Sequence, residues 1–344
     1  MASKRIVVFN HKGGVSKTTS VYNLGWMLSE HHRVLLVDGD PQCNLSSLIL
    51  GDNFEEYYEE DDTKFQNLKD GVESAFKARP KPIEAVTCKS PERAPNLFLL
   101  AGHADLSAND APLTFAQTAG NAIATLQNLP GAFNELLRLT EEKYDIDYTI
   151  IDLNPSLSAI NQNLFLSSDA FIMPTNPDPF SIMAINTLKE TLPRWVEWKR
   201  ANIDVYNDSA YPLSNTEPKF IGALIQRFNI RKGKAARPYR DNIAEIKHKI
   251  SQDLIPVLER SGMALTPEQY TQPLIEDGYC LSEIPDFQGL LPKSYDAEVP
   301  VFALRDDEIR ETGPVFDQMS EKRTRFNKQF EGIADEIVRL MQYA

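Results

Sequence analysis

The chain has 344 residues and a formal net charge of -13, with 49 acidic against 36 basic residues. Its 42% hydrophobic content is ordinary for a globular protein with a buried core, and its length allows one large α/β domain or two modest ones. So acidic a chain does not favour indiscriminate nucleic-acid binding, and any DNA contact is expected from a local basic patch.

The first elements in chain order form a βαβ unit. Residues 5–9 predict a buried strand, residues 18–31 a helix with apolar positions at helical spacing, and residues 34–37 a second buried strand. Strand, loop, helix and strand in this order build a parallel sheet. The apolar run at the N-terminus is too short for a secretory signal and predicts the first strand instead.

The alternation of strand and helix continues along the chain, with the clearest helix over 181–199. A helical region over 115–144 is expected to break at Pro130-Gly131, and residues 307–344 are expected to form a charged helical extension. The pattern predicts one doubly wound α/β domain over 1–344, with a mostly parallel sheet and helices on both faces. Further strands are expected at 97–100, 148–153, 170–174, 220–225 and 280–285.

Residues 51–95, after the second strand, interrupt this alternation. Residues 52–62 are rich in acids, and a proline-containing stretch follows at 79–82. We predict an insertion at the edge of the fold, for which a solvated excursion is favoured over a dedicated binding site.

Cysteine usage favours a reducing compartment. Cys43, Cys88 and Cys280 are widely spaced and form no Cys-x-x-Cys pair, so no disulfide framework, zinc site or iron–sulfur site is predicted. No apolar stretch is long enough to span a membrane. The expected location is the cytoplasm.

The segment from Asn10 to Thr19 carries phosphate-binding chemistry between the first strand and the first helix. Gly13 and Gly14 allow a tight turn whose backbone N–H groups converge on phosphate oxygens, and the helix start adds the positive end of its dipole. Lys17 is placed to reach the β- and γ-phosphates, and the Thr18 hydroxyl to bind Mg²⁺.

This segment resembles the deviant Walker A motif of the ParA/MinD superfamily, whose usual form is KGGVGKTT. The strict P-loop pattern is not met, because His11 and Ser16 stand at its glycine positions. Ser16 is expected to be tolerated if its φ is negative. The resemblance implies ATP and Mg²⁺ as cofactors, with nucleotide contacts from Lys12, Gly13, Gly14, Val15, Ser16, Lys17, Thr18 and Thr19.

The same resemblance gives Lys12 and Lys17 catalytic roles. Lys12 is implied to cross the interface of an ATP-dependent homodimer and touch the nucleotide of the partner. A cation supplied in trans offsets the charge that develops on the phosphates.

Carboxylates follow two buried strands, where side chains face the ligand crevice of a doubly wound sheet. Residues 37–42 resemble the family's D-x-D-P-Q segment, which implies that Asp40 positions the attacking water and that Asp38 supports the magnesium shell. A helix cap is the alternative for this acidic pair. Asp152 resembles a Walker B acid that holds the magnesium-bound water. Asn154 replaces a proline of the family's D-x-P-P, so a more mobile segment is expected.

Later segments resemble the walls of the family's adenine site. Residues 220–229 are similar to the strand beside the base, which implies base contacts from Gln226 and Arg227, although the family often has asparagine at the first position. Pro285 and Phe287 lie in a segment resembling the opposite wall. An ordinary core aromatic is the alternative for Phe287.

Residues 217–250 are locally basic, with nine lysines and arginines against three acids. ParA-like proteins bind DNA non-specifically through such residues in the ATP-bound dimer, and counterion release makes that binding salt-dependent. A solvated loop with nucleotide-facing arginines is the alternative. A second basic cluster lies in the tail, whose helical apolar spacing favours packing over a membrane anchor. The candidate DNA contacts are Arg231, Lys232, Lys234, Arg237 and Arg240.

The favoured function is a ParA-type ATPase that dimerises around ATP, binds DNA or another surface, and positions DNA or protein cargo. Its slow hydrolysis of ATP to ADP and phosphate is stimulated by a partner protein, and DNA binding would place it at the nucleoid. One alternative is a nucleotide-gated switch without DNA binding, with the acidic insertion as its docking surface. Another is a metabolic enzyme on the same scaffold, such as a dethiobiotin synthetase-like ligase; the absence of paired cysteines disfavours a nitrogenase iron protein-like reductase.

Overall fold

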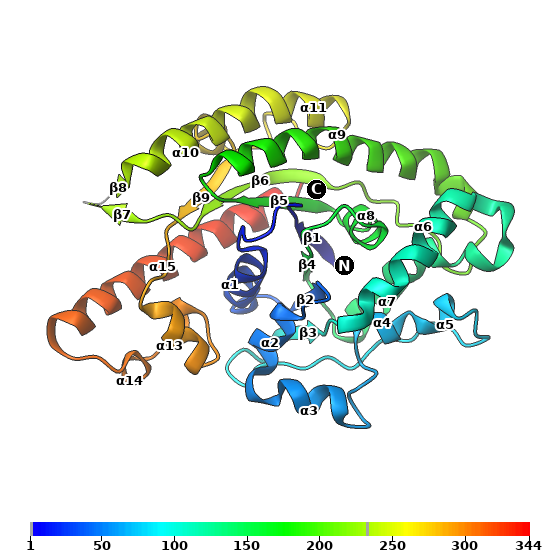
Figure 1. Cartoon of the computed structure of the whole chain (residues 1–344), viewed down its shortest axis with the longest axis horizontal. Helices are drawn as coiled ribbons and strands as arrows, with labels where there is room; N and C mark the ends of the chain where they lie inside the picture. The colour runs from blue at the N-terminus through cyan, green and yellow to red at the C-terminus, as the bar shows by residue number, and fades with distance from the viewer. Residues whose placement is uncertain (1–2, 232–233) are drawn as a thin grey trace.

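The computed structural model describes residues 3–231 and 234–344. One sheet of seven strands has the order β3-β2-β4-β1-β5-β6-β9, and every neighbouring pair is parallel (Figure 1). This confirms the predicted doubly wound α/β class. The strands are β1 (Lys4–Val8), β2 (Val34–Gly39), β3 (Leu97–Leu100), β4 (Tyr148–Leu153), β5 (Ala170–Thr175), β6 (Lys219–Gln226) and β9 (Cys280–Ile284).

Helices cover both faces of the sheet. Crossovers between parallel strands are right-handed, so connections running toward β3 lie on one face and connections running toward β9 on the other. In Figure 1, α9 and α10 lie above the sheet and α1 and α15 below it. The first face carries α1 (Lys17–Ser29), α2 (Asn44–Leu50) and α15 (Gly313–Leu340); the second carries α7 (Leu129–Lys143), α8 (Ala159–Leu166), α9 (Pro179–Asn202) and α10 (Arg237–Lys249).

Smaller elements complete the chain. A short antiparallel hairpin, outside the main sheet, joins β6 to α10. The remaining strands and helices are β7 (Ile230–Arg231), β8 (Lys234–Ala235), α3 (Phe54–Glu59), α4 (Leu68–Gly71), α5 (Glu73–Phe76), α6 (Asp110–Ala119), α11 (Ile255–Arg260), α12 (Gln272–Glu276), α13 (Leu290–Asp296) and α14 (Asp306–Ile309).

The break in the region over 115–144 lies earlier than predicted. Short 3₁₀ turns separate α6 from α7 over residues 120–126, and Pro130-Gly131 belongs to the first turn of α7. Proline is tolerated there because its missing N–H has no helical acceptor. Gly131 is required by packing, since a Cβ would lie 1.8 Å from the carbonyl oxygen of Tyr211.

The 51–95 segment is solvated along its acidic part and along the proline-containing stretch at 79–82. Asp52, Glu55 and Asp61 are exposed, whereas Leu68 and Val72 are fully buried and join the main hydrophobic cluster. The apolar side chains therefore pack the segment against the edge of the domain and leave an acidic ridge in solvent.

The tail helix α15 packs against α1, and its buried residues include Phe326, Phe330 and Ile337. It begins later than predicted because Arg310 adopts a φ of 50° and ends α14. Among the described residues, no helix combines the length and apolarity that crossing a membrane requires.

Lys199, near the end of α9, is a cation buried to 3% exposure. Its ammonium donates to the carbonyl oxygen of Leu166 at 2.6 Å and to the hydroxyl of Ser214 at 2.8 Å. Burial lowers the pKa of Lys199 to about 8, although the charges of Glu217 and Asp169 oppose this shift.

We expect this lysine to make stability rise with pH. An unfolded lysine titrates near about pH 10.4, so between about pH 8 and pH 10 the unfolded chain keeps a proton that the folded chain has released. From about pH 7.5 to about pH 9.5, the unfolding free energy of the wild type should gain about 2 kcal/mol relative to that of Lys199→Met. Urea denaturation of both proteins measures this difference, and a pH-independent difference would contradict it.

Candidate nucleotide-binding site

The loop between β1 and α1 is fixed to the neighbouring strand β5. The side-chain amide of Asn10 donates to the carbonyl oxygen of Pro174 at 2.9 Å, and its oxygen accepts the backbone N–H of Lys12 at 3.0 Å. Gly14 adopts a φ of 72°, the left-handed conformation that glycine favours. The loop then enters α1 at Lys17, where the first N–H groups of a helix lack helical acceptors.

Ser16 does not have the negative φ at which the sequence analysis expected a serine to be tolerated. Its φ is 61°, in the left-handed region, where the Cβ of a serine costs about 1 kcal/mol relative to glycine. The hydroxymethyl group is accommodated, but with backbone strain at the start of the helix. The glycine of the family pattern avoids this strain.

A cavity of about 870 Å³ lies at the carboxyl end of the sheet and brings together predicted residues from four segments. Lys12 and Gly13 lie outside its lining. The predicted residues that line it are Gly14, Val15, Ser16, Lys17, Thr18, Thr19, Asp40, Gln226, Arg227, Pro285 and Phe287.

Several residues that line the cavity were not predicted from the sequence. Tyr22 lies one turn after Thr18 on α1, a spacing that could have indicated it. Tyr295 and Glu298 come from α13 and the segment after it, and Asp52 from the start of the insertion. No local motif marks these three residues, because the fold brings them to the cavity from distant parts of the chain.

Lys17 is a buried cation that lines the cavity. It is 7% exposed, and its ammonium donates to the carbonyl oxygen of Lys12 at 3.1 Å. Burial lowers the pKa of Lys17, while the negative charges of Asp152 and Asp40 oppose the shift. A buried cation with a single carbonyl acceptor retains capacity to bind an anion.

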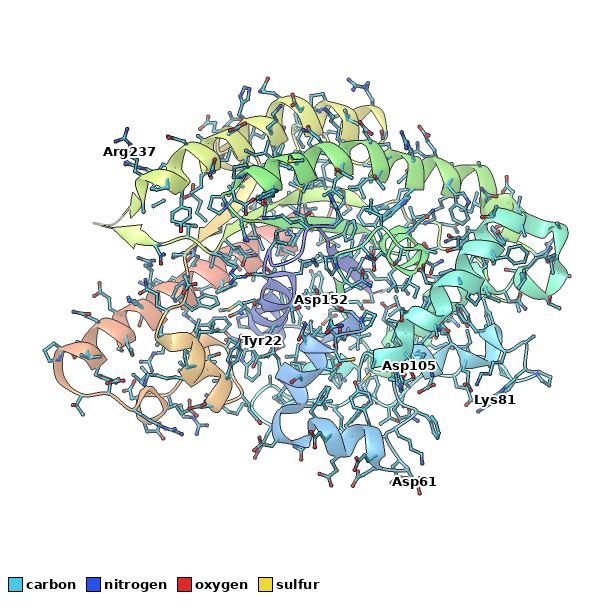
Figure 2. All side chains as sticks on the ribbon, viewed as in Figure 1. Tyr22, Asp61, Lys81, Asp105, Asp152 and Arg237 are labelled. Atoms are coloured by element: carbon cyan, nitrogen blue, oxygen red, sulfur yellow. The ribbon has the colours of Figure 1, made fainter. Side chains whose placement is uncertain are left out.

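Asp152 is the most poorly satisfied polar group near the cavity. It is fully buried beside Asp38 on the adjacent strand, close to the centre of the molecule in Figure 2. Burial and the charge of Asp38 raise the pKa of Asp152 well above its ordinary value, and Thr18 and Lys17 oppose this shift. Neither carboxylate oxygen makes a hydrogen bond of ordinary geometry to the part of the chain that the structure describes. Such a carboxylate requires a cation, a proton or water.

Asp38 and Asp40 have different surroundings. Asp38 accepts the backbone N–H and the hydroxyl of Ser46 at 2.8 and 2.7 Å, so it also fixes the first turn of α2. Burial raises the pKa of Asp38 to about 6. Asp40 accepts the backbone N–H of Gln42 at 3.0 Å and lines the cavity. Asp40 is thus the acid with access to a ligand, and the metal role of Asp38 stays a prediction beside its capping role.

The two predicted base-binding walls face the cavity. Gln226 donates to the hydroxyl of Ser20 at 2.6 Å, and Arg227 donates to the carbonyl oxygen of Gly14 at 3.0 Å. Phe287 lines the cavity but also packs edge-on against Phe326 of α15, with ring centroids 4.8 Å apart. Its ring therefore belongs to the core as well as to the cavity wall.

Lys12 points to the start of α9. Its ammonium is ion-paired with the carboxylate of Asp178 and donates to the hydroxyl of Ser181 at 3.1 Å. The sequence did not predict this ion pair.

The candidate DNA contacts cluster around the β7–β8 hairpin and the start of α10. Arg231 and Lys234 belong to the hairpin, and Lys232 lies outside the described residues. Arg237 and Arg240 are exposed on α10, and Arg237 points away from the body at the rim of the molecule in Figure 2. Asn242 of the same helix donates to the carbonyl oxygen of Pro177, just before α9, at 3.0 Å.

Comparison with known sequences relates this site to a family of nucleotide-binding proteins. The model of a family described as an AAA domain matches residues 3–205. The chain is 33% identical over 201 residues to an uncharacterized protein of Methanocaldococcus jannaschii, a match covering 58% of this chain and 68% of the relative. It is 30% identical over 203 residues to the sporulation initiation inhibitor protein Soj of Bacillus subtilis, covering 59% and 69%.

Another relative is covered over a smaller share of its own length. The chain is 34% identical over 233 residues to an uncharacterized protein of Mycobacterium tuberculosis, and the match covers 66% of this chain and 64% of the relative. It therefore spans less than two thirds of that relative.

Solved structures share the fold along nearly the whole chain. The structure of pNOB8 ParA bound to nonspecific DNA has a TM-score of 0.58 at 19% identity and covers 99% of each chain. A complex of a Cyanothece McdA variant with ATP has a TM-score of 0.58 at 18% identity and covers 98% of this chain and 97% of that one. At these identities the likeness concerns the fold alone.

Proposed function

The chain belongs to the ParA/MinD-like P-loop ATPases, and from this premise we propose that it is an ATPase that forms a dimer around ATP and Mg²⁺ to position DNA or protein cargo. The observation that carries the proposal is the cavity that joins Lys17, Thr18 and Asp40 at the carboxyl end of the sheet, with Asp152 buried beneath it. A partner protein that stimulates hydrolysis belongs to the same proposal.

The residues fit a magnesium nucleotide. Among the described residues, none makes a hydrogen bond of ordinary geometry to the buried Asp152 carboxylate, and Thr18 and Lys17 lie close enough to lower its pKa. Thr18 and a water on Asp152 would hold Mg²⁺, which commonly combines few carboxylates with waters and phosphate oxygens. Mg²⁺ would offset charge on the phosphates, while Lys17 and the N–H groups at the start of α1 bind and orient them. Gln226, Arg227 and Pro285 would border the base.

The experiment that tests this function is the solution mass with ATP and Mg²⁺, with ADP, and without nucleotide. The proposal predicts a monomer that becomes a dimer with ATP alone, and a dimer that persists longer in Asp40→Ala. A nucleotide-binding protein whose mass never changes would contradict the dimer mechanism.

We also propose non-specific DNA as the surface that the ATP-bound dimer binds, through the basic residues of the β7–β8 hairpin and α10. One structural neighbour, pNOB8 ParA, is bound to nonspecific DNA, and here Arg237 and Arg240 are exposed on the first turns of α10. We expect Arg237→Ala/Arg240→Ala to reduce ATP-dependent retention on DNA at least about tenfold and to flatten its salt dependence, because fewer counterions are released.

The matched control is Lys81→Ala, at the opposite side of the molecule in Figure 2. It should leave retention unchanged. Retention that survives the α10 substitutions would contradict this surface. A wild type that dimerises with ATP but never binds DNA would favour the nucleotide-gated switch instead.

A further inference from the structure

An open groove of about 840 Å³ lies between α10 and α15, apart from the nucleotide cavity. Arg240, Ile243 and Lys247 line it from α10, and their spacing places them on one face of that helix. Arg325 and Lys328, three residues apart, line it in the same way from α15. In Figure 1, β9 and the β7–β8 hairpin lie between these two helices. Two helices from opposite faces of the sheet therefore form the walls of the groove.

The charges that line the groove are unbalanced. Among its described lining residues Glu283 is the one acid, and Lys247 forms an ion pair with it at 2.6 Å. Arg240, Arg325 and Lys328 are exposed, and no ion pair joins any of them to another described residue. These three cations are therefore available to the carboxylates of a ligand, which the planar fork of an arginine binds with two hydrogen bonds.

The floor of the groove is apolar. Phe228, Ile230 of the hairpin and Ile243 of α10 form it, and Ile230 is partly exposed. Ala244, on the same face of α10, lines the groove and is exposed. An apolar floor inside a charged rim suits a ligand that carries apolar side chains together with charges of the opposite sign. DNA phosphates would contact the rim cations alone and leave the floor in water.

We propose that this groove binds a short acidic segment of a partner protein. Its apolar side chains pack on the floor, and its carboxylates pair with Arg240, Arg325 and Lys328. Charge complementarity selects this occupant, because the chain as a whole has a net charge of -13 and repels an acidic partner elsewhere on its surface. One copy of the chain forms the whole groove, so we expect binding with and without ATP.

A random peptide library displayed on phage tests the inference with the full chain. Peptides selected on the wild type should share about three acids and about two large apolar residues. A selected peptide, synthesised with a fluorescent label, should bind more weakly as salt is added. Arg325→Glu/Lys328→Glu should reduce its affinity at least about tenfold, because two of the three available cations become acids.

Two further variants separate the groove from general charge effects. Arg79→Glu/Lys81→Glu is the matched control, because it makes the same change of charge at exposed residues, and Lys81 lies at the opposite side of the molecule from the start of α10 in Figure 2. It should leave the affinity unchanged. Ala244→Gln, at an exposed helical position, should weaken the peptide at least about threefold, because its longer side chain fills space that the apolar side chains of the peptide need.

Selection of peptides without acids, or of none, would overturn the inference, and so would equal affinity for the wild type and Arg325→Glu/Lys328→Glu. If that variant loses retention on DNA and the wild type selects no peptide, the groove binds DNA instead. Arg240 also belongs to the proposed DNA surface, so the peptide should displace DNA from the ATP-bound protein, a consequence that rests on the proposed function. A wild type that binds the peptide but never DNA would support the inference and contradict the DNA surface alone.

Discussion

Lys17→Ala is expected to lose detectable ATP binding. Lys17 is 7% exposed and lines the cavity, where a phosphate would replace its single contact to the carbonyl oxygen of Lys12 with charge-assisted hydrogen bonds. Such contacts in a partly dehydrated site are each worth about 1.5–3 kcal/mol, so losing two weakens binding by about a hundredfold or more. Without the lysine, Asp152 and Asp40 would also repel the phosphates.

Isothermal titration calorimetry with ATP and Mg²⁺ measures this loss. Lys12→Ala is the matched control, because it removes a lysine from the same loop whose ammonium faces α9. Lys12→Ala should bind ATP as a monomer with nearly wild-type affinity and fail to hydrolyse it. If the two variants lost the same affinity, the division into a lysine acting in cis and one acting in trans would be wrong.

The fold was largely predictable because its strands are buried on both faces. Continuous apolar runs, such as residues 34–37, leave little alternative to a parallel sheet. Helix boundaries were less predictable where tertiary contacts decide them. Pro130-Gly131 looks like a break in the sequence, yet both residues lie in the first turn of α7, where Gly131 leaves room for the backbone of Tyr211.

Part of the candidate site could likewise be predicted from the sequence, and part could not. The phosphate loop and Asp40 follow from residue types at fixed spacing beside a strand end, and the structure places them on one cavity. Partners that only the fold brings together could not be foreseen, such as Asp178 for Lys12 and Ser46 for Asp38. These contacts depend on how β5 and α2 are placed against the loop, which no local pattern encodes.

Asp40→Ala is expected to separate ATP binding from hydrolysis. Asp40 is 8% exposed, lines the cavity and follows β2. Asp38, two residues earlier, is fully buried, and its carboxylate accepts a hydrogen bond from the hydroxyl of Ser46. Asp40 is therefore the carboxylate of this pair with an oxygen available to orient an attacking water. Groups in this role contribute about a hundredfold to ten-thousandfold, so kcat should fall by about a thousandfold while the Kd for ATP stays within about threefold.

Single-turnover hydrolysis and equilibrium ATP binding, measured on the same preparation, check this separation. Asp40→Asn is the informative companion, because its amide oxygen can still accept the backbone N–H of Gln42 but is a much weaker acceptor for a water proton. If Asp40 acts on the water, both variants lose hydrolysis and both remain dimeric with ATP. If Asp40 only shapes the segment before α2, Asp40→Asn keeps its turnover, and the water-positioning role must move to another residue of the cavity.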